Sequence, residues 1–264
     1  SLAKIIKKCV SDGIIAPGFE SEAFELLKAK KGGNYPIFQI DPEFVPDQNE
    51  IREVFGITLE QTRNNFVPTD DFFDNRVSAR IDLSDEAKRD LTVATIAVKY
   101  TQSNSVTLAR DGQIIGIGSG QQSRVHCVRL ACSKADNWYL RQHPNVTSMQ
   151  FKKNVKRAEK VNAIDIYLQE EATPNELAAW RTNFERVPDL ISSEEKRQYL
   201  DQMSGVALSS DAFFPFRDNI DRASRSGVEY IIQAGGSVRD DDVIQAVNEY
   251  GMLMINSGIR LFHH

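Results

Sequence analysis

The sequence predicts an α/β fold, and three observations support that prediction. In the last third of the chain, short apolar runs alternate with helix-like segments, which is typical of a βαβαβ unit with parallel strands. Asp111-Gly112 stands between two apolar runs and favours a β-hairpin, because a type I′ turn needs positive φ at both central residues. A glycine-rich turn then leads into a helix-like segment that starts at Arg124. Strands and helices therefore alternate along the chain, which defines the class.

Composition narrows the class of protein. With 264 residues, the chain is long enough for one large domain or two modest ones. Its 41% hydrophobic and 26% charged residues are ordinary for a soluble globular protein, and no apolar run is long enough to span a bilayer. The net charge of −5 argues against nucleic acid as a partner, because nucleic-acid binders carry a basic face. The three cysteines show no paired spacing, which favours a reducing compartment and so a cytoplasmic location.

Residues 1–45 predict part of a first α/β unit. Residues 14–18 indicate a strand end and turn, residues 21–30 a helix, and residues 35–40 a strand. The chain starts without an initiator methionine and runs straight into Ser11-Asp12-Gly13, so we expect this unit to be truncated. Residues 46–83 are expected to form an irregular connecting arm, because Val-Pro pairs recur around this stretch and are loop signals.

Residues 84–264 predict a second α/β unit with a helical insertion near residues 150–205. Ser84 is a helix N-cap, and the apolar band behind it indicates a long helix that ends before the polar residues 102–105. Capping-box spacings at Thr173 and Ser192 predict two polar helices in the insertion. Strands are then expected at residues 206–209, 230–234 and 252–255, and helices at residues 217–226 and 241–250.

Two candidate ligand contacts flank the predicted hairpin. The turn before Arg124 opens a helix, where free N–H groups and the helix dipole suit an anion, and the guanidinium adds a planar fork for a carboxylate or phosphate. A tight turn with a surface arginine fits the same spacing. Asn104 stands where a helix ends and a strand begins. Its carboxamide can bond its own backbone, or donate to and accept from a substrate.

Two further junctions lie in the predicted βαβαβ unit. Residues 209–219 link a strand to a helix, and ligands of open α/β sheets bind at the carboxyl ends of strands. Phe213, Phe214 and Phe216 can form a stacking wall for a flat heterocycle there, or a core edge. Ser237, after the next strand, can cap the following helix or contact a ligand. The apolar residues 259–264 predict a docked rather than a frayed C-terminus.

Several catalytic motifs are missing. Zinc deaminase chemistry needs a His-x-Glu or Cys-x-Glu motif with a downstream Cys-x-x-Cys. His126 is followed by Cys127 and Val128, and no Cys-x-x-Cys occurs in the sequence. The sequence also holds no Walker A loop and no Gly-x-Ser-x-Gly elbow. We therefore predict no metal site.

Four motifs together resemble a known enzyme family. They are residues 98–106 (VKYTQSNSV), 118–127 (GSGQQSRVHC), 210–219 (SDAFFPFRDN) and 260–264 (RLFHH), and the segment that begins Ser11-Asp12-Gly13 matches as well. In this combination they are similar to the AICAR transformylase part of the bifunctional purine biosynthesis proteins, the transformylase/IMP cyclohydrolase family. The resemblance covers essentially the whole chain.

The resemblance implies both a fold and a reaction. The fold is a cytidine deaminase-like three-layer sandwich in tandem duplication, without zinc and with the first unit truncated here. The reaction transfers the formyl group of 10-formyltetrahydrofolate, a co-substrate, to the 5-amino group of aminoimidazole carboxamide ribonucleotide (AICAR) in de novo purine synthesis. The expected partners are AICAR, folate and a second copy of the chain, because the family works as a homodimer with sites at the interface.

The family pattern, carried over position by position, assigns roles to residues of this chain. Asn104 and His264 are expected to be catalytic. Nucleotide contacts are expected at Asp12, Asn104, Arg124, Phe213 and Arg260, and folate contacts at Val125, Phe213, Asn219, Ser237 and Val238. Val125 replaces the isoleucine that is usual in relatives and keeps the apolar contact.

One departure from the family is serious. The family's catalytic Lys-His pair lies upstream of the Ser-Asp-Gly segment, and no Lys-His pair occurs in this sequence. We expect the chain alone to be inactive or nearly so, because formyl transfer to a weak amine needs one proton taken and another given. The missing N-terminal part of the enzyme is then a possible partner. Two alternatives stay open: a non-catalytic nucleotide- and folate-binding or dimerisation module of the same fold, and a nucleotide-binding protein of other specificity.

Overall fold

The computed structural model describes residues 2–169 and 172–262, and it divides the chain into two compact units, Ser1–Arg63 and Asn64–His264. The described residues form a mixed α/β structure with ten α-helices and a five-stranded mixed sheet. The boundary between the units falls within the stretch that the sequence predicts as a connecting arm.

The first unit is small. Its elements are α1 (Leu2–Lys8), β1 (Ile14–Ala16), α2 (Ser21–Lys28), a 3₁₀ turn (Lys30–Gly33), β2 (Ile37–Gln39), β3 (Asn49–Val54) and β4 (Ile57–Thr62). Strands β1 and β2 pair in parallel, with Ile14 opposite Ile37. The helix and both short strands agree with the prediction for residues 1–45.

The irregular arm expected for residues 46–83 is wrong over residues 49–62, where β3 and β4 form a regular antiparallel hairpin. Phe55 and Gly56 make its turn with φ of 51° and 78°, the signs that a type I′ turn requires. Phe-Gly is not among the usual turn pairs, and the strands are rich in charged and polar residues. The sequence signal is therefore that of a loop.

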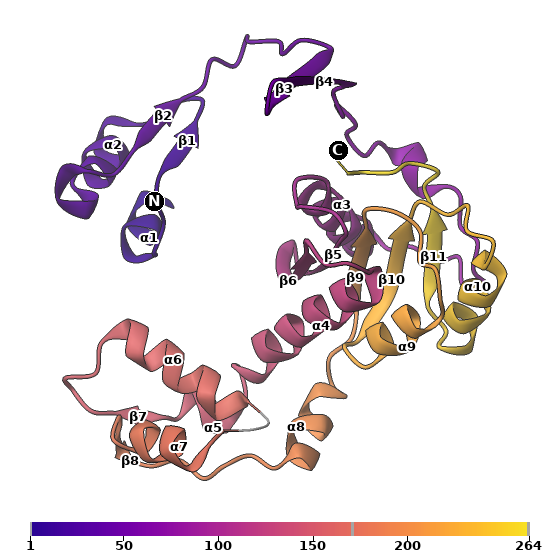
Figure 1. The fold of residues 1–264 in the computed structure, drawn as a ribbon. Helices are drawn as coiled ribbons and strands as arrows, with labels where there is room; N and C mark the ends of the chain where they lie inside the picture. Colours follow the sequence, from indigo (N-terminus) through magenta and orange to yellow (C-terminus); the bar gives the residue numbers. More distant parts are fainter. Residues whose placement is uncertain (1, 170–171, 263–264) are drawn as a thin grey trace. The chain divides into compact units, whose positions relative to one another are not determined.

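The second unit is built on one mixed sheet, with strand order β11-β10-β9-β5-β6 (Figure 1). Its strands are β5 (Ser105–Arg110), β6 (Gln113–Ser119), β9 (Val206–Ser210), β10 (Val228–Gln233) and β11 (Leu253–Asn256). Strands β9, β10 and β11 are parallel, whereas β5 runs antiparallel to both β9 and β6. Asp111 and Gly112 join β5 to β6 with φ of 53° and 74°, so the predicted hairpin is confirmed.

Helices cover both faces of this sheet. Helices α4 (Arg124–Leu140), α9 (Asp218–Ser224) and α10 (Asp240–Glu249) pack on one face, where Leu208 and Ile231 are buried (Figure 1). Helix α3 (Asp85–Lys99) lies on the other face, where Leu91 packs with Ala207 and Ile232. Neighbouring residues of one strand thus enter different cores, as the two-residue period of a strand requires.

Helix α4 approaches β6 closely enough to exclude side chains at two positions. A Cβ atom on Gly118 would lie 2.0 Å from the carbonyl oxygen of Cys127, and one on Gly116 would lie 2.1 Å from that of Ala131. These two glycines lie within β6, ahead of the turn, and they allow the close packing of α4 on this strand.

The helical insertion contains α5 (Pro144–Thr147), α6 (Arg157–Leu168), α7 (Pro174–Arg181) and α8 (Ser193–Leu200), with a two-stranded sheet of β7 (Gln150–Phe151) and β8 (Phe184–Arg186). Both predicted capping boxes are confirmed. Thr173 Oγ1 accepts from the N–H of Glu176, and Ser192 Oγ accepts from the N–H of Glu195. Each glutamate bonds the cap N–H in return.

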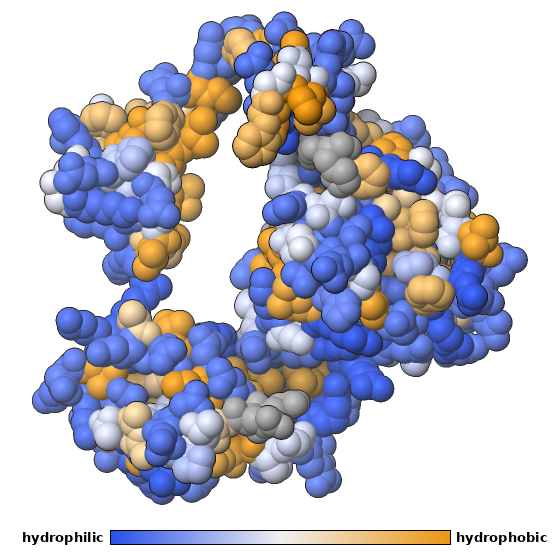
Figure 2. Space-filling view, in the orientation of Figure 1, coloured by the Kyte–Doolittle hydropathy of each residue, from blue (hydrophilic) through white to orange (hydrophobic). Residues whose placement is uncertain are grey.

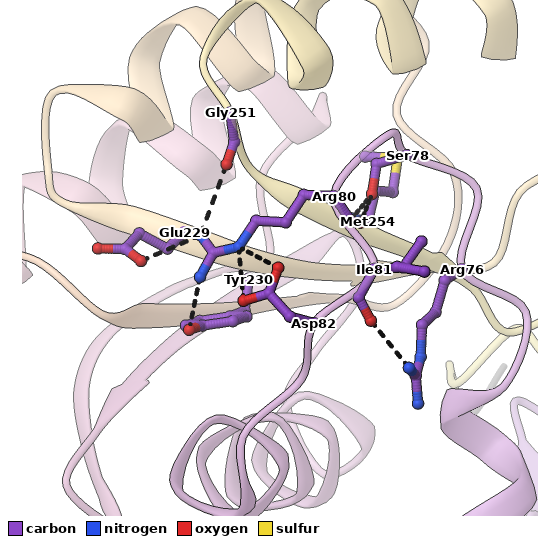
Figure 3. A network of polar contacts seen from close by, with 9 residues as sticks. All are labelled: Arg76, Ser78, Arg80, Ile81, Asp82, Glu229, Tyr230, Gly251 and Met254. Atoms are coloured by element: carbon purple, nitrogen blue, oxygen red, sulfur yellow. Dashed lines mark hydrogen bonds and ion pairs between the residues drawn. The ribbon is translucent and has the colours of Figure 1, made fainter.

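Residues 75–82 cover the outer edge of β11 (Figure 3). The N–H of Val77 donates to the carbonyl of Met254 at 2.9 Å, and the N–H of Met254 donates to Ser78 Oγ at 2.8 Å. Arg80 donates to Tyr230 Oη at 2.9 Å and pairs with Glu229 at 3.2 Å. Burial opposes the charge of Arg80, but its hydrogen bonds to Asp82 and Glu229 prevail and raise its pKa. This segment therefore covers the β11 edge of the sheet, and β6 is the strand at the opposite edge.

Candidate functional site

The strand registers bring five connecting segments to one edge of the sheet. Ser105, the first residue of β5, lies opposite Ser119, the last of β6, and Val106 lies opposite Ser210, the last of β9. The carboxyl ends of β9, β10 and β11 share that edge because these strands are parallel. We call it the loop edge; it consists of residues 101–104, 120–125, 211–219, 234–239 and 257–262.

Most of the predicted site residues belong to the loop edge. Those within it are Asn104, Arg124, Val125, Phe213, Asn219, Ser237, Val238 and Arg260. Asp12 belongs to the first compact unit, where it is fully exposed and pairs with Lys31 at 2.7 Å. This lysine lowers the pKa of Asp12 by hydrogen bonding and by its charge. His264 lies outside the described residues.

Asp211 connects the segments of the loop edge, although the sequence analysis gave it no role beyond its place in the motif of residues 210–219. Its carboxylate is fully buried, accepts from Arg124 Nε at 3.0 Å and from the N–H of Ser105 at 3.1 Å, and also accepts from Ser103 Oγ. Its backbone carbonyl accepts from the N–H of Leu261 at 2.9 Å. One residue after β9 therefore holds the starts of β5 and α4 and the C-terminal segment together.

The ion pair with Asp211 changes the interpretation of Arg124. Both Nε and Nη2 of the guanidinium lie 3.0 Å from the same carboxylate oxygen, and the arginine side chain is only 15% exposed. A buried carboxylate thus compensates the charge that was expected to face an anion. The guanidinium is held in a fixed orientation, and its remaining N–H groups are the ones that can reach a ligand.

Asn104 is half-buried and is fixed by two neighbouring segments. Its Nδ2 donates to the carbonyl of Gln121 at 2.9 Å, so the carboxamide does not bond its own backbone. Its backbone carbonyl accepts from Cys127 Sγ at 3.1 Å. Burial raises the pKa of Cys127 to about 11, so this thiol stays protonated and is a donor, not a nucleophile. Within the described residues the side-chain oxygen of Asn104 has no hydrogen-bond partner, so it can accept from a ligand.

The three phenylalanines after β9 do not form one wall. Phe214 is fully buried in the core, Phe213 is half-buried, and Phe216 is exposed, with the Arg239 guanidinium 5.2 Å from its ring centroid. A small cavity of about 180 Å³ lies beside the exposed ring, between the first turns of α9 and α10. Only Phe213 and Phe216 can therefore stack on a ligand.

Asn219 carries an unpaired polar atom in the same region. Its side chain is fully buried, and Nδ2 donates to the carbonyl of Phe216 at 2.8 Å. Its Oδ1 has no partner among the described residues. Because buried polar atoms are nearly always hydrogen-bonded in native proteins, this oxygen calls for a water or a ligand donor.

Of the two roles left open for Ser237, the structure does not support the helix cap. Helix α10 has Arg239 at its N-cap position, and Ser237 Oγ accepts from the N–H of that arginine at 3.2 Å. The carboxylate of Asp240 reaches back to the N–H of Gly236 at 2.7 Å. An aspartate one turn later has the longer reach, so it closes the loop, and Val238 is left fully exposed at its tip.

The C-terminal segment is docked as predicted, as far as Phe262. Leu261 is buried, and its carbonyl accepts from Asn64 Nδ2 at 3.3 Å in addition to the bond from its N–H to Asp211. Arg260 is exposed beside it. The docking places this cation at the loop edge.

The described residues contain neither a metal-binding cluster nor a membrane-spanning helix. No group of three or more His, Cys, Asp or Glu side chains is arranged to hold a metal ion in the described part of the chain. None of the helices within residues 2–169 and 172–262 has the length and apolar character needed to cross a membrane.

Comparison with known proteins gives one consistent result. The family description of the AICARFT/IMPCHase bienzyme matches residues 1–134. The chain is 27% identical over 265 residues to the bifunctional purine biosynthesis protein PurH of Xylella fastidiosa (strain 9a5c), covering 100% of this chain and 38% of that protein. It is 30% identical over 262 residues to PurH of Persephonella marina, covering 99% of this chain and 38% of that protein. It is 28% identical over 264 residues to PurH of Lacticaseibacillus casei, covering 99% of this chain and 39% of that protein. The chain thus spans less than two-fifths of the length of these relatives. The chain belongs to the AICARFT/IMPCHase bienzyme family.

Proposed function

We propose that the loop edge binds AICAR and 10-formyltetrahydrofolate, and that this chain is a portion of a cytoplasmic enzyme that transfers the formyl group between them in purine biosynthesis. In that reaction the bond between the formyl carbon and the folate nitrogen breaks, and a bond to the 5-amino group of AICAR forms. The amine loses a proton and the folate nitrogen gains one. The observation that carries the proposal is the position of Asp211, which ties three motif-bearing segments together at the edge where α/β folds bind ligands.

The contacts of the loop edge suggest a role for each residue. The free carboxamide oxygen of Asn104 would accept from the reacting amine, and Arg260 would face an anionic group of the nucleotide. Phe213 and Val125 would flank the flat rings of the ligands. The unpaired Oδ1 of Asn219 would accept an N–H from the folate heterocycle, and Ser237 and Val238 would contact the folate from the tip of their loop. The catalytic role of His264 and the nucleotide contact of Asp12 rest on the family resemblance alone.

The chain alone is expected to bind without catalysing transfer. Its sequence holds no Lys-His pair to move the two protons. A measurable rate of folate-dependent AICAR formylation by the purified 264-residue chain would refute this part of the proposal. The alternative function, a non-catalytic binding or dimerisation module, predicts that no upstream Lys-His segment restores activity when it is supplied on a longer chain.

A repeated order of elements supports the tandem duplication of a cytidine deaminase-like unit. The first unit runs α1-β1-α2-β2 with parallel strands, and the end of the second unit runs α9-β10-α10-β11, also with parallel strands. In this comparison β1 corresponds to β10. The loop after β1 then corresponds to the loop that carries Ser237.

Exposed apolar side chains support the homodimer. The β3–β4 hairpin exposes Val54, Ile57 and Leu59 on one face and Phe55 at its turn, and Figure 2 shows apolar residues gathered over it. Such a patch is unusual on a monomer. Sedimentation equilibrium should therefore give a dimer for the native chain, and Phe55→Asp should shift it toward the monomer.

Ligand binding tests the site itself. Calorimetric titration of the 264-residue chain should show binding of AICAR and of a reduced folate. Asn104→Ala should weaken AICAR binding about tenfold, because a hydrogen bond to the ligand is lost in a half-buried place. The control Asn154→Ala removes an exposed asparagine elsewhere and should change nothing. Failure to bind either ligand, or equal affinities for the Asn104 variant and the native chain, would contradict the proposal.

A further inference from the structure

A second polar cavity lies away from the loop edge, among four helices of the second unit. Its volume is about 470 Å³, and its walls come from α4, α6, α8 and α9. Helix α4 begins at the loop edge with Arg124, whereas its residues in the cavity wall start at Ser133 and extend to Leu140. Asp136 is twelve residues from Arg124, or about 18 Å along a helix axis. The cavity is therefore spatially separate from the proposed AICAR and folate site.

The wall of this cavity is strongly basic. It contains four cations, Lys196, Arg197, Arg222 and Arg225, against one carboxylate, Asp136. Arg222 pairs with Asp136 at 2.8 Å, and Arg197 pairs with Asp201 and also donates to the carbonyl of Arg225 at 3.0 Å. These contacts fix two guanidinium groups in the wall.

Arg225 differs from the other two arginines. It is exposed, and no ion pair of its side chain occurs within the described residues. Its backbone carbonyl is held by Arg197, so the position of the residue is set while its guanidinium has no carboxylate in contact there. A guanidinium in this state is suited to bind a phosphate, which it can meet with two parallel N–H bonds.

The floor of the cavity is apolar. Leu140, Leu168 and Leu200 line it and are all nearly buried. Asn137 and Gln169 add carboxamides that can donate and accept at the edge of a ring. The three leucines form the apolar part of a lining whose other nine residues are polar or charged, and the volume falls within the range of about 300–1,000 Å³ that is typical of small-molecule pockets. Glu170 and Glu171, which follow Gln169 in the chain, lie outside the described residues.

We propose that this cavity binds a nucleoside monophosphate, with the phosphate on Arg225 and its basic neighbours and the base on the leucine floor. Free phosphate would leave the apolar floor and most of the volume unfilled, and an uncharged nucleoside would leave the guanidinium of Arg225 without an anion. A phosphate monoester joined to a flat ring satisfies both. The site is independent of the loop edge, so its ligand binds together with AICAR and not in its place.

Titration of the full 264-residue chain with AMP tests this assignment. AMP should bind with a submillimolar Kd, and both ribose 5-phosphate and adenosine should bind at least about fivefold more weakly, because each lacks one of the two groups. Arg225→Ala should weaken AMP binding about tenfold through loss of a charge-assisted contact. The matched control Arg181→Ala removes an exposed helical arginine outside the cavity and should leave the affinity unchanged.

A second pair of measurements separates this site from the proposed function. Asn104→Ala should weaken AICAR and leave AMP unaffected, and saturation with AICAR should not displace AMP. If AMP binding is lost in Asn104→Ala and kept in Arg225→Ala, the nucleotide occupies the loop edge and the inference is wrong. Equal binding of AMP and ribose 5-phosphate would also overturn it, because the leucine floor would then contribute nothing.

Discussion

The two compact units use the same alternation of helix and strand, but they bury very different numbers of apolar side chains. In the first unit the buried apolar residues are Ala3, Leu27 and Tyr35, and β1 and β2 leave Ile15 and Phe38 65% and 61% exposed. In the second unit helices cover both faces of a five-stranded sheet, and its central strands β5 and β9 are buried along nearly their whole length.

This difference shows that the order of helices and strands sets the topology of a unit, whereas the number of helical layers packed on its sheet sets its stability. A two-stranded sheet with helices on one face cannot remove enough apolar surface from water to offset the entropy of ordering its chain. A second helical layer nearly doubles the surface that each strand can bury. The predictions below test how far the two units differ in this respect.

The largest effect is expected from separating the units. Residues 64–264 alone should unfold in one cooperative thermal transition, because both cores of the second unit lie within them. Residues 1–63 alone should show no cooperative transition. Circular dichroism melts of the two fragments measure this. A sharp transition with dispersed amide resonances in residues 1–63 would show that the small unit has an adequate core of its own.

The next effect concerns the buried charge at the loop edge. Asp211→Ala leaves the guanidinium of Arg124 without its counter-charge in a place that is only 15% exposed, and should lower the free energy of unfolding by about 3–5 kcal/mol. The control Asp165→Ala breaks a half-exposed pair with Arg141 and should cost about 1 kcal/mol or less. Urea unfolding with unchanged m values measures both. Similar losses of unfolding free energy in the two variants would contradict the role of Asp211 in connecting the loop-edge segments.

Glycine substitutions compare close packing in the two units. Gly118→Ala would place a Cβ 2.0 Å from the Cys127 carbonyl oxygen, so α4 must shift, at a cost of about 1–3 kcal/mol. In the first unit, a Cβ atom on Gly18 would meet no atom within 4 Å beyond its chain neighbours, and Gly18→Ala should change stability by about 1 kcal/mol at most, in either direction. Thermal midpoints rank the two. A larger loss at Gly18 would contradict the comparison.

The smallest effect concerns helix caps. Ser192→Ala removes the cap of α8 and should cost about 1 kcal/mol, whereas Ser193→Ala, one position later, should cost much less. In the first unit α2 begins at an N-cap, Glu20, that makes no side-chain cap bond, so Glu20→Ala should have little effect. Urea unfolding ranks the three variants by their free energy of unfolding. An equal loss for Ser192→Ala and Ser193→Ala would show that the Ser192 cap does not stabilise α8.

The cap of α8 also predicts a pH dependence. Hydrogen bonds from the N–H and hydroxyl of Ser192 lower the pKa of Glu195. Its contribution to stability is therefore complete above the ordinary carboxyl pKa and is lost as the pH falls through the lowered value. The difference in unfolding free energy between the native chain and Glu195→Gln should shrink over that acidic range. A difference that is constant with pH would show that the carboxylate charge does not matter.

Local signals account for the elements that the sequence predicted well. The Asp111-Gly112 hairpin and the caps at Ser84, Thr173 and Ser192 each depend on residues within a few positions of one another. The hairpin of residues 49–62 was missed because its turn pair and polar strands carry no such signal. The segments of the candidate site could also be predicted, from motif positions at the ends of predicted strands, but the contacts between them could not.

The sequence by itself determined the α/β class, the order of elements in the second unit and the membership of most site residues in one set of loops. Only the tertiary structure decided that Asp211 joins these loops, that Arg124 is already paired, and that a basic cavity lies among α4, α6, α8 and α9. The partners of Asp211 stand 87 and 106 residues away from it in the chain. Contacts at such separations follow from how strands pair and helices pack, which no local pattern of residues encodes.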